Sequence, residues 1–157
     1  MPKSPPFTGH SSPAVWPGYA AGAWALLFTL PHVYWALGGT VGLAGRSMTG
    51  TLLLVNLVAI PLLLVAAGGA LGTVQSWGQM IPCWVLLPTV WGTSVVLSVR
   101  GIGGLVQRSF SGELIRNQPL LSLFADPWFV FGGVLFGVAA WAYTRKSRDE
   151  SKLKSGR

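Results

Sequence analysis

Four apolar runs, each close to the length of a membrane span, constrain this chain more than any other feature. They occupy roughly residues 17–37, 51–71, 81–99 and 127–143. A helix needs about 20 apolar residues to cross the roughly 30 Å hydrocarbon core of a bilayer. Charged residues make up only 10% of the chain, against about 25% in soluble domains, so few of them interrupt the runs. The sequence therefore predicts an all-α integral membrane four-helix bundle.

The domain organisation follows from these runs. The chain of 157 residues has room for one domain. We predict a disordered leader over 1–16, which is rich in Pro, Ser and Gly, then the bundle over 17–144, and a basic tail over 145–157. The first apolar run is long and lacks the charged start of a secretory signal, so we expect it to be retained as a span.

The net charge of +7 is unevenly distributed, because six of the eleven basic residues lie in the tail. A basic flank beside a span favours a topology signal and contact with anionic lipid, and argues against nucleic acid as a partner. Four spans place both termini on one side. That side would carry seven Lys and Arg residues and the other side four. We therefore predict a multi-pass protein of the cell membrane with both termini in the cytoplasm.

Several chemistries are excluded by residue counts. Cys83 is the only cysteine, which rules out an internal disulfide and a CxxC motif. The two histidines, His10 in the leader and His32, rule out a haem held by two membrane-buried histidines and a two-histidine iron triad. No P-loop, no Ser-His-Asp set and no acidic cluster for magnesium and a diphosphate is present. We expect no metal and no cofactor.

The first span carries an unusual polar and aromatic sequence. Trp24, Phe28, His32 and Trp35 fall within about 80° of one another on a helical wheel, so they share one face. A histidine at membrane depth is costly and is usually functional. His32 could hydrogen-bond a neighbouring helix and so stabilise the bundle, or it could shuttle a proton or contact a substrate.

Prolines near the middle of three spans, at positions 31, 61 and 88, favour kinked helices that diverge around a cavity. The alternative is that prolines are simply commoner in membrane helices. We take the aromatic and amide side chains expected to face such a cavity as candidate substrate-binding residues. They are Trp24, Tyr34, Trp35, Asn56, Trp84 and Trp91. Indole faces would suit a carbocation or a quaternary amine; aromatic packing, and interhelical bonding by Asn56, are the structural alternatives.

The candidate catalytic residues are Asp126, Glu113 and His32. Only four acidic residues exist, and Glu113 and Asp126 lie outside the basic tail. Either could act as a general acid, because an apolar site favours a protonated carboxyl group. Asp126 followed by Pro127 is also typical of a helix N-cap and first turn. Residues 105–124 could lie on the membrane surface as a short amphipathic helix or lid.

The segment from Pro31 to Gly39, PHVYWALGG, resembles a family of small bacterial four-span membrane proteins of unknown function. Their first span carries His-x-x-Trp-x-x-Gly-Gly, matched here by His32, Trp35, Gly38 and Gly39. This resemblance covers most of residues 17–143 and implies a fold and no activity. In architecture the chain is also similar to small membrane-bound terpene cyclases, which implies an aromatic cavity and a lone carboxylic acid that protonates an alkene or epoxide.

These observations lead to two main hypotheses. In the first, the protein acts on an isoprenoid-like hydrophobic molecule, most concretely as a protonation-initiated terpene cyclase. In the second, it is a non-catalytic membrane subunit or scaffold that packs partner helices or forms a homo-oligomer through glycine seams, the close-packing pairs Gly18/Gly22 and Gly133/Gly137. A small transporter is a third hypothesis. The sequence leaves open whether the protein is an enzyme; its expected partners are the lipid bilayer and a hydrophobic small molecule.

Overall fold

The regular elements of this chain are helices throughout the part that a computed structural model describes, residues 15–43, 45–111 and 120–155. They are α1 (Trp16–Ala36), α2 (Gly50–Gly72), the short 3-10 helix η1 (Ser76–Met80), α3 (Cys83–Ser111) and α4 (Leu120–Ser155). The predicted all-α class is therefore confirmed over these ranges. The ends predicted for the first two spans agree with α1 and α2 to within a residue.

Three of the four long helices have the length and apolar composition needed to cross a membrane. The qualifying stretches are Gly50–Gly72, Cys83–Phe110 and Phe124–Arg148. Large apolar side chains also cover the outside of α2, where Leu52, Val58 and Leu62 are all exposed. Exposed apolar surface of this extent suits hydrocarbon better than water. The chain thus has the features of a membrane protein.

Helix α1 is the exception among the predicted spans. Its 21 residues would rise about 31 Å at 1.5 Å per residue, which is long enough to span. It is not among the three spanning candidates, because its tryptophans, prolines and histidine lower its mean hydropathy. The fourth span stays a prediction, and so does the side of the membrane on which the termini lie.

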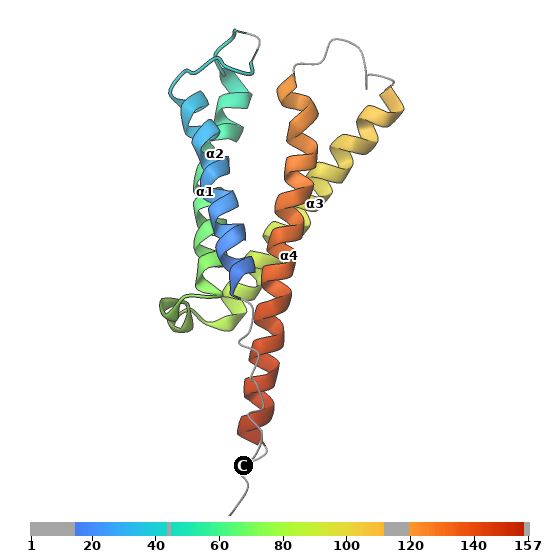
Figure 1. Cartoon of the computed structure of the whole chain (residues 1–157). Helices are drawn as coiled ribbons and strands as arrows, with labels where there is room; N and C mark the ends of the chain where they lie inside the picture. Colours follow the sequence, from blue (N-terminus) through green and yellow to red (C-terminus); the bar gives the residue numbers. More distant parts are fainter. Residues whose placement is uncertain (1–14, 44, 112–119, 156–157) are drawn as a thin grey trace, which may run out of the picture.

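The helices pack as two pairs, α1 with α2 and α3 with α4 (Figure 1). Figure 1 shows the pairs meeting near the end where α1 begins and diverging toward the other end. Glycines permit the close approach within each pair. A Cβ on Gly18 would lie 3.0 Å from the carbonyl oxygen of Ala70, and one on Gly133 would lie 3.0 Å from the backbone nitrogen of Ser98. These two glycine seams are therefore filled by helices of the same chain.

Helices α3 and α4 are longer than predicted. The third span was expected to end near 99, but α3 continues to Ser111; the fourth was expected to begin at 127, but α4 begins at Leu120 and continues through most of the basic tail. Asp126 is therefore not an N-cap, because it lies inside α4. Two arginines of α3 pair with its carboxylate, in place of the backbone N–H groups from which an N-cap side chain would accept. Pro127 likewise lies inside α4 and not in its first turn.

In the segment 105–124, which could form a surface helix or lid, the described residues do not make a separate helix. Residues 105–111 complete α3, and residues 120–124 begin α4. The remainder of that segment, 112–119, and the first fourteen residues of the predicted leader lie outside the described residues.

Candidate functional site

An apolar groove of about 600 Å³ lies between the second half of α1 and the first part of α4. Its walls are Leu27, Phe28, Pro31, His32 and Trp35 of α1 and Phe124, Ala125, Pro127, Trp128, Phe129 and Phe131 of α4. Apart from one imidazole and two indole nitrogens, these side chains present only carbon. Leu27 and Phe124 are themselves exposed, so the groove is open at its rim. Its volume is in the range of pockets for small ligands, about 300–1,000 Å³.

Aromatic contacts join the two walls of the groove. Phe28 of α1 meets Phe129 of α4 edge to face, with ring centroids 5.2 Å apart. Beneath them, Trp24 stacks on Trp128 at 5.8 Å and lies edge-on to Phe136 at 6.3 Å. Each such pair contributes about 0.5–1.5 kcal/mol beyond area burial. Trp24, one of the predicted substrate-binding residues, is buried behind the groove. It therefore supports the wall and does not line it.

His32 is the one ionisable side chain on the walls. Its Nδ1 lies 2.9 Å from the carbonyl oxygen of Phe28. A carbonyl only accepts, so Nδ1 must carry the hydrogen, and in the neutral ring Nε2 then has the lone pair. Asn56 of α2, which is buried, donates through Nδ2 to the carbonyl oxygen of His32 at 2.8 Å. Asn56 therefore binds the backbone of α1, and His32 keeps one ring nitrogen available for a ligand.

The glycine pair after α1 has a structural explanation. Gly38 has φ of 92°, and its N–H and that of Gly39 donate to the carbonyls of Trp35 and Tyr34, which is the Schellman arrangement that ends a helix. The two aromatic side chains then hold the following loop. Trp35 donates through Nε1 to the carbonyl of Val41 at 2.9 Å, and the Tyr34 hydroxyl accepts from the Val41 N–H at 3.3 Å. Tyr34 acts on this loop and is not on the groove wall.

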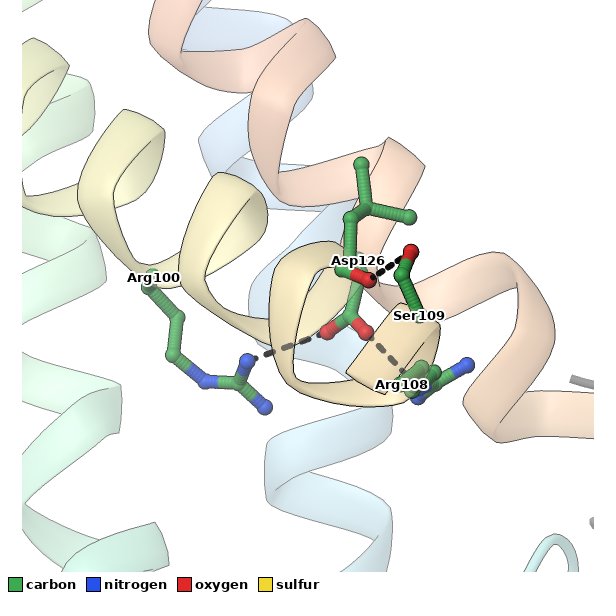
Figure 2. A network of polar contacts seen from close by, with 5 residues as sticks. Arg100, Arg108, Ser109 and Asp126 are labelled. Atoms are coloured by element: carbon green, nitrogen blue, oxygen red, sulfur yellow. Dashed lines mark hydrogen bonds and ion pairs between the residues drawn. The ribbon is translucent and has the colours of Figure 1, made fainter. Parts of the chain in front are cut away.

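A buried ion-pair network links α3 and α4 beside the groove (Figure 2). Asp126 is 1% exposed, and its Oδ1 accepts from Nη1 of Arg100 at 3.0 Å. Its Oδ2 lies 3.0 Å from Nε of Arg108, without the alignment of a hydrogen bond. Figure 2 shows the two arginines reaching the carboxylate from opposite sides. Gly104 of α3 makes room for it, because a Cβ there would overlap the carboxylate.

The structure thus brings together only some of the predicted site residues. His32 and Trp35 line the groove, with Trp24 and Asn56 behind it. Trp84 is 77% exposed and Trp91 is 40% exposed, and neither lies on the groove wall, so the structure does not bring them together with His32 and Trp35.

Of the two predicted acids, the structure describes only Asp126. Asp126 is absent from the groove walls, although its neighbours Ala125 and Pro127 line the groove. Glu113 lies outside the described residues.

Sequence reasoning missed the aromatic wall contributed by α4. Phe124, Trp128, Phe129 and Phe131 all line the groove. The signal was present as four aromatic residues within eight positions around Asp126 and Pro127. Phe124 precedes the predicted fourth span and the other three lie within it, but no inward face is predicted for that span.

Among the described residues, no group of three or more His, Cys, Asp and Glu side chains is placed to hold a metal ion. The polar groups near the groove are an imidazole, an amide and one carboxylate with its two arginines. The arrangement suits binding of a hydrophobic molecule, with the imidazole as its polar contact.

Comparison with known families adds a classification. One family model matches residues 25–136, which is more than half of the chain. This family is described as "Protein of unknown function (DUF3995)". The matched region contains every residue of both groove walls. No curated protein and no solved structure matches the chain. The family match supports the prediction of a family of unknown function. It supports neither the motif His-x-x-Trp-x-x-Gly-Gly as a signature of that family nor the likeness to terpene cyclases.

Proposed function

We propose that this chain, which belongs to the DUF3995 family of unknown function, binds an isoprenoid-like hydrophobic molecule within the membrane. The observation that carries the proposal is the groove between α1 and α4, whose walls are almost entirely apolar and hold six aromatic rings besides the imidazole. Its rim is open, so a lipid-soluble molecule could enter from the bilayer.

The aromatic walls decide which hydrophobic molecule is favoured. Lipid tails are about as apolar as the groove, so a saturated chain gains little by leaving the bilayer for it. A chain with double bonds, or one that develops positive charge, gains from the π faces of Trp and Phe. The imidazole of His32 adds a single polar contact. An isoprenoid alcohol such as farnesol combines these features and is the simplest probe.

The test measures binding of farnesol to the full chain in phosphatidylcholine nanodiscs. Occupancy is read by native mass spectrometry as the mole fraction of farnesol in the bilayer rises. Ala125→Phe places a ring in the groove and should reduce occupancy at least tenfold. Ala59→Phe is the matched control, since Ala59 is also partly exposed but lies on α2 away from the groove. No binding by the folded wild-type chain would refute the proposal and favour the non-catalytic subunit.

A protonation-initiated cyclisation is the reaction that such a groove would serve. An acid would protonate a terminal alkene or epoxide, the aromatic walls would stabilise the cation, and Nε2 of His32 would accept the final proton. The support is limited to the walls and the imidazole, because Asp126 is not on the walls and Glu113 lies outside the described residues.

The cyclisation is tested by incubating membranes in deuterated water with linear farnesyl-substituted aromatics and their epoxides. An alkene substrate should give a product with a new retention time and one carbon-bound deuterium. An epoxide should give the new product without that label, because its proton ends on oxygen. Unchanged substrates with folded protein that binds farnesol would reject the cyclase and leave the binding function standing.

A further inference from the structure

Arg100 lies beside the groove, and the function proposed above does not use it. Its Cζ sits 5.0 Å from the centroid of the Phe129 ring, which is one of the groove walls. The same ring contacts Phe28 of the opposite wall. The Arg100 side chain is 55% exposed, so a ligand at the groove can reach it. The Arg100 guanidinium over the face of Phe129 therefore gives the otherwise apolar groove one positively charged edge.

The positive charge of Arg100 and Arg108 is only half balanced by the carboxylate with which they pair. Two guanidinium groups, Arg100 and Arg108, share the single carboxylate of Asp126. Arg108 is only 20% exposed, whereas Arg100 is the more exposed of the two. A guanidinium has five N–H donors, and among the described residues one donor of Arg100 is committed, to Oδ1 of Asp126. The network therefore retains one unit of positive charge and donors that can serve an anion.

We propose that the molecule in the groove is an amphiphile, an isoprenoid-like chain that ends in a phosphate monoester, and that Arg100 binds the phosphate. This inference rests on the function proposed above and adds the headgroup. The chain would lie along the aromatic walls while the phosphate meets the guanidinium beyond Phe129. A planar guanidinium matches phosphate geometry with two parallel hydrogen bonds, which makes phosphate a better partner than a neutral hydroxyl.

The groove and the Arg100 guanidinium adjoin each other, so together they favour a lipid phosphate over free phosphate. One exposed guanidinium on a membrane protein holds inorganic phosphate weakly in water. The groove supplies the additional contact only to a ligand with a hydrophobic chain. Removal of water from the ion pair by the chain and the bilayer would strengthen it further.

The experiment compares farnesyl phosphate with farnesol on the same protein in phosphatidylcholine nanodiscs, again by native mass spectrometry. The two probes share the chain and differ in the headgroup. Wild-type protein should bind farnesyl phosphate at least tenfold more tightly, which is about 1.4 kcal/mol. Inorganic phosphate at equal concentration should not displace it. Displacement would place the site outside the groove and overturn the inference.

Substitutions then assign the preference to Arg100. Arg100→Gln should reduce the affinity for farnesyl phosphate to that for farnesol and leave farnesol binding unchanged. Arg145→Gln is the matched control, because Arg145 also lies over an aromatic ring, Trp141 at 3.8 Å, but far along α4 from the groove. Arg100→Lys keeps the charge but loses the planar fork of donors, so it should retain only part of the preference.

The outcomes separate the two proposals. Equal binding of the two probes by wild-type protein would overturn the phosphate inference and leave the groove as a hydrocarbon site. Binding of neither probe would overturn both. Because the comparison of headgroups uses the unmodified chain, it gives a decision even where Arg100→Gln fails to fold.

Discussion

Replacing Asp126 with asparagine tests the role of the buried network in holding α3 against α4. The change preserves size and removes the negative charge, so both arginines lose their shared carboxylate. Removing one partner of a buried ion pair costs about 3–5 kcal/mol. Arg100 is 55% exposed, so its long side chain can turn toward polar surroundings, whereas Arg108 is only 20% exposed; only the Arg108 pair should therefore carry this cost. We expect the free energy of unfolding to fall by about 3 kcal/mol.

The assay is reversible unfolding in mixed micelles of dodecylmaltoside and dodecyl sulfate, followed by tryptophan fluorescence. A second substitution, Arg108→Gln, removes the stranded cation and should recover part of the loss. Coupled residues in one network show interaction energies of about 0.5–3 kcal/mol. The reasoning is refuted if Asp126→Asn stays within about 0.5 kcal/mol of wild type, the range of ordinary surface changes. It also fails if the two substitutions are simply additive.

Three further substitutions test local features in the same unfolding assay. Gly38→Ala should lower the free energy of unfolding by about 1–2 kcal/mol, because φ of 92° is a left-handed conformation. Gly92→Ala on α3 is the control and should be neutral or stabilising, because a Cβ there meets open space. Gly104→Ala should cost more than about 1 kcal/mol, since its Cβ would overlap the Asp126 carboxylate, and no loss would mean that α3 and α4 can separate freely. Asn56→Leu should cost about 1 kcal/mol, because the His32 carbonyl loses its donor, and an unchanged stability would show that the α1–α2 contact does not depend on this bond.

The first two helices could be predicted well from sequence because their limits are set locally. Glycine at position 38 and the apolar run before it determine where α1 ends, and the run of leucine and valine defines α2. Pro31 and Pro61 lie inside these helices as expected. Such signals act over a few residues and are visible along the chain.

The lengths of α3 and α4 could not be predicted in the same way. An isolated arginine suggests the end of a span, and Asp126 followed by Pro127 suggests a helix start. In the structure, Arg100 and Asp126 are 26 positions apart and pair inside the two helices. This pairing offsets the cost of burying the carboxylate within α4, and a contact between such distant residues is not visible along the chain.

The exposure of Trp84 and Trp91 on α3 has a related cause. The sequence predicts that these aromatic residues point inward, but the side of α3 that contacts α4 carries small residues. Ser94 donates to the carbonyl of Gly133 at 2.7 Å, and a Cβ on Gly101 would lie 2.8 Å from the carbonyl oxygen of Asp126. Close backbone approach decides helix packing in a membrane, so Trp84 and Trp91 are left on the outside.

The position of Asp126 also decides how a loss of activity in its variants should be interpreted. Its flanking residues Ala125 and Pro127 line the groove, while its own carboxylate points to α3. A catalytic acid and a clamp that holds the α4 wall would both lose function in Asp126→Asn. The double variant Asp126→Asn with Arg108→Gln separates these two roles, because it restores part of the contact between α3 and α4 but supplies no proton donor. Recovery of farnesol binding together with any cyclisation would identify a clamp, whereas recovery of binding alone would identify an acid.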